Sequence, residues 1–289
     1  MGRLWKCVVL IIAIVGGAPP AAAQMLGPYK DEAYAYPPII TSEFGGDYRV
    51  FAYDETRQAK RQPATRGHRI LPSPPHVSQR DLVSRTNVGD IAHVAAGREE
   101  AAALIVVYLH GRGGTRRQGV DDGSAGGNFN RIKTMVVQAG GLYLSPDFSE
   151  FGERGAVEVA ALLRPYMAAS PGAPVFLACG SMGGAICYWL AEDATIAARL
   201  GGLLLLGTYP DDTFLASEAF RLNVPVLIAQ GTSDTVYNVE WMEAFFSAIR
   251  IASPGYPVKM VSFDRGTHGA PIRMVDWRET INWMLSVDR

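Results

Sequence analysis

The sequence predicts an α/β fold: a mostly parallel, doubly wound sheet with helices on both faces. Two observations support this prediction. Short and almost wholly apolar runs recur after residue 101, and segments with apolar residues at helical spacing lie between them. Strands of a parallel sheet are buried on both faces and have such continuous apolar sequences. Strands that alternate with helices form right-handed crossovers, which place helices on both sides of the sheet.

Apolar runs and helical spacing define the expected elements in order. The expected strands are 103–109, 141–144, 174–178, 202–206, 225–229 and 258–263. Helices are expected at 129–138 and 156–167, and a third is expected to start after Asn238, a good capping residue. A final helix has Pro271 in its first turn and ends near Leu285. No internal repeat or linker divides this part of the chain.

Composition and charge exclude several classes of protein. The chain has 289 residues, of which 48% are hydrophobic and 19% charged, and its net charge is −1. A disordered chain would be poorer in apolar residues and less balanced in charge. Lys and Arg (27) nearly equal Asp and Glu (28), so the composition gives no support for nucleic-acid binding. No apolar run reaches the roughly 20 residues of a membrane-spanning helix. We therefore expect a globular protein.

The first 23 residues have the layout of a secretory signal peptide. Arg3 and Lys6 precede an unbroken apolar run at 7–15, and three alanines at 21–23 form a suitable cleavage site. We expect cleavage after Ala23, which leaves a secreted or periplasmic protein with no stable membrane anchor. The alternatives are an uncleaved anchor or a wrongly assigned start codon.

Cleavage of this signal leaves two cysteines, Cys179 and Cys187, on one turn-plus-helix segment. Eight residues of helix span about 12 Å. The Cα atoms of a disulfide lie only about 4.4–6.8 Å apart. We therefore expect two free, packed thiols and a domain held together by its core.

Residues 24–100 show a weaker pattern, and we treat them as an N-terminal extension of a core at 101–289. The whole of 24–289 is expected to form one domain. Strands are expected at 48–53 and near 90–95. Between them, the basic stretch 57–69 has few apolar residues, and we favour a solvated loop over a patch for an anionic surface.

The loop after the strand at 174–178 contains a candidate nucleophile, Ser181. It reads CGSMGG at 179–184, and a helix follows. A strand, a tight turn of small residues with a central serine, and a helix together form a nucleophile elbow. The glycines let the helix pass close to the strand, and its first N–H groups can face an anion. The alternative is a glycine-rich turn whose serine only caps the helix.

With this motif, the sequence resembles the α/β-hydrolase superfamily, and the resemblance covers about residues 101–285. The usual family motif is G-x-S-x-G, and here Cys179 replaces the first glycine. The resemblance implies the α/β-hydrolase fold, with no large lid domain. Only 207–223 separates two expected strands where relatives commonly insert a lid, which leaves room for a single helix and a fairly open site.

The strand at 103–109 leads into HGRGG at 110–114, where relatives have an H-G motif. The resemblance implies an oxyanion hole formed by the N–H of Met182 and that of Arg112 or Gly113. It also implies a structural role for His110, although a role as base is the alternative. A phosphate-binding loop is excluded because no Gly-Lys-Ser/Thr follows. The arginines at 112, 116 and 117 favour an acidic substrate or are simply solvated.

Two later loops provide an acid and a base. Asp234 follows the strand at 225–229 and resembles the acid loop of the family, and His268 is the only histidine after residue 110. The order Ser181, Asp234, His268, each after a separate strand, is that of α/β-hydrolases. Asp211 or Asp212 is the alternative acid.

These residues imply a serine hydrolase that cleaves a carboxylic ester through an acyl-enzyme. No cofactor is needed, and no metal-binding spacing of His or Cys is present. Candidate substrate contacts are Tyr209, Tyr237 and Phe148, for which core packing is nearly as good an explanation. The layout is similar to small carboxylesterases, dienelactone hydrolases and secreted esterases near polyhydroxyalkanoate depolymerases and feruloyl esterases.

The expected substrate is a small-molecule or polymer ester. One alternative is a serine peptidase or thioesterase that uses the same three residues. An alternative of another class is a catalytically silent periplasmic relative that only binds a ligand.

Overall fold

The computed structural model describes residues 26–53, 77–122 and 124–288. The signal peptide expected at 1–23 and the basic stretch at 57–69 lie outside these residues. Within the described ranges, no helix combines the length and the apolar character that crossing a bilayer requires.

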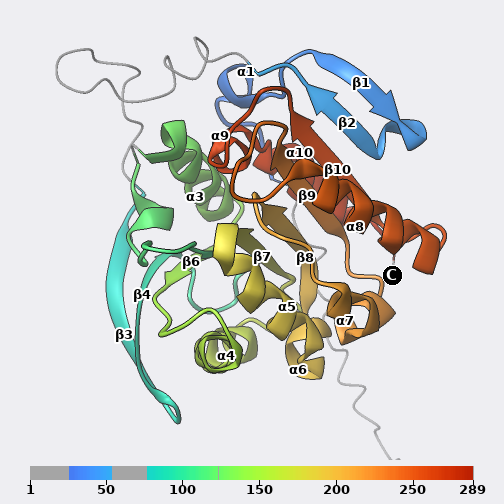
Figure 1. Cartoon of the computed structure of the whole chain (residues 1–289). Helices are drawn as coiled ribbons and strands as arrows, with labels where there is room; N and C mark the ends of the chain where they lie inside the picture. The colour runs from blue at the N-terminus through green and yellow to red at the C-terminus, as the bar shows by residue number, and fades with distance from the viewer. Residues whose placement is uncertain (1–25, 54–76, 123, 289) are drawn as a thin grey trace, which may run out of the picture.

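A ten-stranded sheet runs through the described part of the chain in the order β1-β2-β10-β9-β8-β7-β5-β6-β4-β3. Figure 1 shows β1 and β3 at its two edges. Neighbouring strands from β2 to β6 in this order are parallel, and the outer strands β1, β4 and β3 pair antiparallel. The mostly parallel sheet is therefore confirmed. The strands are β1 (Ile39–Glu43), β2 (Tyr48–Phe51), β3 (Gln79–Thr86), β4 (Gly89–Gly97), β5 (Ile105–Leu109), β6 (Leu142–Pro146), β7 (Val175–Gly180), β8 (Leu200–Leu206), β9 (Val226–Gly231) and β10 (Val258–Phe263).

Helices cover both faces of the sheet, as the sequence predicts. One face packs against α4 (Glu153–Ala169), α5 (Gly184–Glu192) and α8 (Val239–Ala252). The other face packs against α3 (Asn128–Gln138), α9 (Ala270–Met274) and α10 (Trp277–Leu285). Shorter helices are α1 (Asp31–Tyr34), α6 (Ala194–Ala197) and α7 (Glu218–Arg221), and 3-10 turns lie at Phe44–Gly46, Gln118–Val120, Ser124–Gly127, Ser181–Gly183 and Asp212–Ala216.

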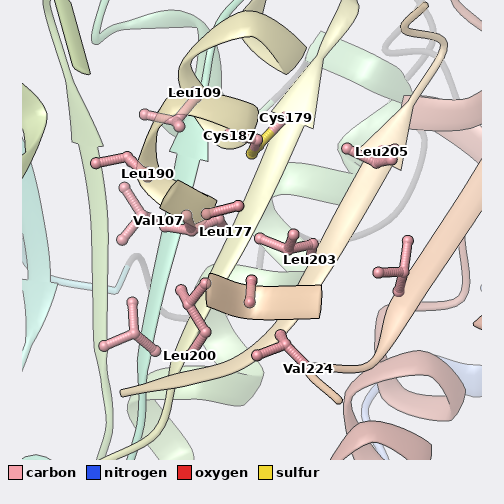
Figure 2. Packing of buried hydrophobic residues seen from close by; sticks show 14 of the residues in the cluster. Val107, Leu109, Leu177, Cys179, Cys187, Leu190, Leu200, Leu203, Leu205 and Val224 are labelled. Atoms are coloured by element: carbon pink, nitrogen blue, oxygen red, sulfur yellow. A yellow bond between two sulfur atoms is a disulfide. The ribbon is translucent and has the colours of Figure 1, made fainter. Parts of the chain in front are cut away.

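The central strands are apolar because both of their faces are buried. In β5, Val107 and Leu109 face the α5 side, Val106 and Tyr108 face the α3 side, and all four are at most 1% exposed. Successive strand residues point to opposite faces, so such a strand needs a helical layer on each side. Figure 2 shows labelled side chains of β5, β7 and β8 packed together on the α5 side. Full burial of each large aliphatic side chain contributes about 1.5–3 kcal/mol.

The chain before residue 101 supplies both edges of this sheet. β2 pairs with β10, the last strand of the chain, whereas β4 pairs with β6 near the opposite edge. The strands expected at 48–53 and near 90–95 correspond to β2 and β4. β1 and β3 were not predicted, because most of their residues are exposed and they have no continuous apolar run.

A buried arginine connects the segment before β1 to the helices. Arg131 of α3 is fully buried and donates hydrogen bonds to Asp31, to Asp276 and to the carbonyl oxygen of Tyr29, each at 3.0 Å. Two carboxylates and a carbonyl compensate the loss of water around the guanidinium. The segment that contains α1 is therefore held against α3 and the start of α10.

The prediction of two free thiols is wrong, since Cys179 and Cys187 form a disulfide with their Cα atoms 6.4 Å apart. The prediction treated the residues between them as one rising helix. In the structure, Cys179 is the next-to-last residue of β7, and the chain reverses at Ser181 before α5 begins. α5 therefore lies back against β7 and brings Cys187 beside Cys179 (Figure 2).

The C-terminal helix predicted from Pro271 to Leu285 is two helices, α9 and α10. Pro271 does lie in the first turn of α9. That helix ends at Met274, and the Asp276 carboxylate then accepts hydrogen bonds from the N–H groups of Arg278 and Glu279. An aspartate that caps in this way starts a new helix, which explains the break.

Candidate active site

The loops that follow β5, β7, β9 and β10 meet at one edge of the sheet. These strands are parallel, so their carboxyl ends all point the same way. Ligands of open α/β sheets bind outside this edge. Ser181, Asp234 and His268 and the expected oxyanion donors Met182, Arg112 and Gly113 lie in these loops, whereas the alternative acids Asp211 and Asp212 follow β8.

Ser181 lies at the sharp turn between β7 and α5. Its φ of +51° is in the left-handed region, which is unfavourable for residues with a side chain. The glycines that follow allow this turn to form. A Cβ atom on Gly183 would collide with the carbonyl oxygen of Leu109, and one on Gly184 would collide with the Thr208 hydroxyl. The turn projects Ser181 from the edge of the sheet.

His268 lies between Ser181 and Asp234. Its Nε2 atom is 2.8 Å from Oγ of Ser181, and its Nδ1 atom is 2.8 Å from Oδ2 of Asp234. An ionised carboxylate only accepts hydrogen bonds, so Nδ1 carries the hydrogen and the neutral Nε2 accepts from the serine hydroxyl. The Asp234 side chain is fully buried, whereas that of His268 is 30% exposed. The imidazole can therefore exchange protons with a bound substrate or water.

Four donors hold the Asp234 carboxylate. Besides His268, the side chain of Gln230 donates to Oδ2, and the backbone N–H groups of Val236 and Tyr237 donate to Oδ1. These hydrogen bonds offset the cost of a buried charge and fix the orientation of the carboxylate.

The alternative acids lie in a different environment. Asp211 caps the 3-10 turn at Asp212–Ala216, where its Oδ1 atom accepts from both the N–H and the hydroxyl of Thr213. The structure thus places Asp234, and not Asp211, on the imidazole of His268.

The glycine loop after β5 lies against the nucleophile. A Cβ atom on Gly111 would lie 2.8 Å from Cβ and 3.3 Å from Oγ of Ser181, so only a glycine allows this approach. The N–H of Gly114 donates to the carbonyl oxygen of Gly111 at 3.0 Å, which closes a turn around Arg112 and Gly113. The start of this turn therefore lies directly against Ser181.

His110 belongs to the scaffold of this loop. Its Nδ1 atom donates to the carbonyl oxygen of Gly111 at 2.9 Å, and its ring stacks on Phe148 with centroids 4.3 Å apart. Phe151, which the sequence analysis did not single out, contacts the edges of both rings. Phe148 therefore packs on the glycine loop, and the ring of His110 holds that loop in place.

Two of the three aromatic candidates, Tyr209 and Tyr237, lie together, and Tyr237 is next to His268. The Tyr237 ring stands edge-on to the imidazole with centroids 5.6 Å apart, and the Tyr209 ring is 5.4 Å from that of Tyr237. Burial raises the pKa of the Tyr237 phenol, and this effect is opposed by Arg112 and by a hydrogen bond with Ser181. Tyr237 is therefore a neutral hydroxyl close to the nucleophile.

Like Phe151, Gln230 is a residue of this site that the sequence-based prediction missed. Its side chain is fully buried and donates to both Asp234 and the carbonyl oxygen of Tyr237. The available signal was a lone polar residue directly after the apolar run 225–229. A polar side chain at the end of a buried strand needs a partner, and here the partner is the acid.

The described residues contain no group of three or more His, Cys, Asp or Glu side chains arranged to hold a metal ion. They do contain a serine hydroxyl, that of Ser181, hydrogen-bonded to the imidazole of His268, which is hydrogen-bonded in turn to the buried carboxylate of Asp234. Such a chain can transfer the hydroxyl proton to the imidazole as the oxygen attacks an electrophile.

No protein-family model and no curated protein matches this sequence. Solved structures do match. A protein of unknown function from Agrobacterium tumefaciens, described as an α/β hydrolase, is 15% identical with a TM-score of 0.56, over 70% of this chain and 93% of that one. An esterase from Pyrococcus furiosus is 14% identical with a TM-score of 0.53, over 78% and 97%. A serine hydrolase without lid from Xanthomonas campestris is 15% identical with a TM-score of 0.51, over 75% and 96%.

The chain therefore has the α/β-hydrolase fold. Between β8 and β9 the described chain holds only the 3-10 turn Asp212–Ala216 and α7, so no large lid domain is inserted there. The sequence-based expectation of a lidless α/β-hydrolase fold is confirmed. At these sequence identities the likeness establishes the fold, and the activity has to be argued from the site.

Proposed function

We propose that this protein is a serine hydrolase that cleaves carboxylic esters through an acyl-enzyme intermediate. The observation that supports this best is the hydrogen-bonded chain from Ser181 through His268 to the buried Asp234. The described structural neighbours are hydrolases or esterases, which agrees with the proposal.

In the first half of the reaction, Oγ of Ser181 attacks the ester carbonyl while Nε2 of His268 takes the hydroxyl proton. The carbonyl oxygen becomes an oxyanion, which accepts hydrogen bonds from the N–H of Met182 and that of Arg112 or Gly113. Each such donor is worth roughly 3–4 kcal/mol of transition-state stabilisation. The intermediate then collapses, the bond to the leaving oxygen breaks, and His268 returns the proton to that oxygen.

In the second half, water attacks the acyl-enzyme with His268 again as the base. The acid product leaves and Ser181 regains its proton. Asp234 stays ionised, keeps the hydrogen of the imidazole on Nδ1, and stabilises the imidazolium that forms in each half. The substrate in this proposal is a small-molecule or polymer ester, which Tyr209, Tyr237 and Phe148 contact.

We further propose that the enzyme acts outside the cytoplasm, in the periplasm or after secretion. The layout of residues 1–23 supports a cleaved signal peptide. The Cys179–Cys187 disulfide agrees with this location, because disulfides persist in oxidising compartments and are rare in the cytosol.

Labelling with a fluorophosphonate probe tests the proposal, because the probe phosphorylates activated serines. We expect labelling of the wild type and hydrolysis of 4-nitrophenyl acetate, and loss of both in Ser181→Ala and His268→Ala. Ser42→Ala, on the exposed edge strand β1, is the matched control and should keep both. Circular dichroism verifies that each variant folds. A folded wild type that neither labels nor hydrolyses any ester would instead be a ligand-binding relative.

A further inference from the structure

The glycine loop after β5 is followed by two arginines, Arg116 and Arg117, that form ion pairs with carboxylates. Arg116 donates to Asp81 at 2.8 Å and to Asp147 at 2.6 Å, and these hydrogen bonds raise its pKa. Arg117 lies 3.4 Å from Asp81. The charges of both arginines are therefore balanced within the protein.

Arg112 differs from both. Within the described residues its guanidinium has no carboxylate at ion-pair distance, and its one recorded hydrogen bond goes from Nε to the sulfur of Met182 at 3.3 Å. A thioether is a weak and uncharged acceptor. The side chain is exposed, so both the positive charge and the two terminal amino groups of the guanidinium face solvent.

The contact with Met182 places this cation beside the nucleophile. Met182 directly follows Ser181 and supplies one of the proposed oxyanion donors. An unmatched positive charge thus stands next to the position where the reacting carbonyl binds.

A groove of about 370 Å³ lies along the same loop and gives a bound molecule room to reach Arg112. Its walls include Arg112, Thr115, Arg117, Gln118, Asp121 and Ser124. The groove contains two guanidinium groups and a single carboxylate, that of Asp121, which accepts from the N–H of Ser124 at 2.7 Å. Arg117 is already paired with Asp81, so Arg112 is the guanidinium of this groove that has no carboxylate partner among the described residues and can bind an anion.

We propose that the preferred substrates are esters that carry an anionic group such as a carboxylate, and that this group lies in the groove and binds the guanidinium of Arg112. This inference rests on the proposed function, because it names the substrate class of the same site. Arginine suits the role, since its planar amino groups can bind both oxygens of a carboxylate.

The size of the effect follows from the exposure of Arg112. An ion pair open to solvent contributes less than a buried one, so we expect a preference of roughly 3–10-fold in kcat/KM for an anionic ester over a neutral one. Dissolved salt screens exposed charges, so the preference should shrink as ionic strength rises.

Pairs of esters that differ only in charge measure this preference. With the charge on the leaving group, the pair is 4-acetoxybenzoate and 4-acetoxybenzamide. With the charge on the acyl group, the pair is the monoethyl ester of succinate and the corresponding ethyl ester of succinamic acid. In each pair a neutral amide replaces the carboxylate with nearly the same shape. The readout is the ratio of kcat/KM for the anionic ester to that for the neutral one.

Arg112→Gln should bring this ratio close to one for the pair that the wild type prefers. The backbone N–H of Arg112 is itself a proposed oxyanion donor, so the substitution could lower activity toward every ester. Such a general loss affects both esters of a pair equally and cancels in the ratio of their kcat/KM values. Arg164→Gln is the control. It removes the same charge from a residue paired with Asp193, at the opposite end of α5 from Ser181, and should leave the ratio unchanged.

The outcomes separate the two proposals. A ratio near one for both wild-type pairs, or an equal change in Arg164→Gln, overturns the role of Arg112, while continued ester turnover upholds the proposed function. Absence of turnover for every ester, with no labelling of Ser181, overturns both. A preference that disappears in Arg112→Gln and at high salt supports the anionic substrate.

Discussion

Gln230 donates a hydrogen bond to Oδ2 of Asp234, 2.8 Å away, the same oxygen that accepts the N–H of His268. Its amide nitrogen also donates to the carbonyl oxygen of Tyr237 at 2.7 Å. One buried side chain thus connects the acid to the loop that bears an aromatic neighbour of His268. Gln230 is a positioning residue, because it acts on the reaction only through Asp234.

Gln230→Met should therefore lower kcat by roughly 10-fold, the loss expected when one hydrogen bond to the buried carboxylate is removed. Methionine has a similar volume and no donor. Because Gln230 does not reach the substrate, KM should change little. Steady-state kinetics with 4-nitrophenyl acetate separates the two constants. An unchanged kcat in a folded variant would show that Asp234 is held well enough by its backbone donors.

Asp234→Asn should lower kcat by about 10⁴-fold, since an amide in place of the carboxylate favours the wrong tautomer of His268. With the hydrogen on Nε2, the imidazole can no longer accept the serine proton. Asp211→Asn and Asp212→Asn are the comparison, and both should retain nearly full activity. A large loss in Asp211→Asn together with a small one in Asp234→Asn would reverse the assignment of the acid.

Gly111→Ala should reduce ester hydrolysis at least 100-fold without a matching loss of Tm. The new methyl group would lie 2.8 Å from Cβ of Ser181, so either the glycine loop or the nucleophile has to move. A displacement of about 1 Å at a reacting group can cost about 100-fold in rate. Gly27→Ala is the control, because no atom lies within 4 Å of the added Cβ. Equal activity in the two variants would mean that the loop shifts without consequence.

Replacement of both Cys179 and Cys187 by alanine should lower the free energy of unfolding by about 2–3 kcal/mol, as expected for a disulfide that closes a short loop. Urea unfolding measures the change. Both cysteines are buried, so a mild reductant should leave the disulfide of the native wild type intact. If the disulfide is reduced in the unfolded chain, the wild type and the double variant should have the same free energy of unfolding. Equal stability of the oxidised wild type and the variant would contradict a stabilising disulfide.

His93 should make the protein less stable in mild acid. Its Nδ1 donates to the carbonyl oxygen of Ile91, its Nε2 accepts from the hydroxyl of Tyr166, and burial lowers its pKa below the ordinary value of about 6.5. The unfolded chain therefore takes up this proton at a higher pH than the folded protein does. Below about pH 6.5 the unfolded state binds more protons, so stability falls as the pH decreases.

The measurement for His93 is the free energy of unfolding at about pH 7.5 and about pH 5. We expect His93→Gln to be less stable than the wild type at the higher pH, and the difference between them to shrink at the lower pH. A difference that is the same at both values would show that His93 does not titrate on unfolding in this range.

The central part of the fold and the three residues of the proposed mechanism could be predicted because each depends on local sequence. Strands β5 to β10 are largely buried on both faces, and burial strongly favours apolar residues, so the runs are visible without any knowledge of the tertiary structure. Ser181, Asp234 and His268 lie in the loops that follow such strands, and parallel strands place all such loops at one edge.

The remaining features depend on distances between parts of the chain that the sequence separates. The edge strands β1 and β3 are exposed and so have no apolar pattern. The disulfide depends on how α5 folds back on β7, and a linear count of residues cannot give that distance. Local sequence likewise does not distinguish Arg112, which has no carboxylate partner among the described residues, from Arg116, which is paired with Asp81 and Asp147. Only the packed structure decides these cases, because it determines which charges meet.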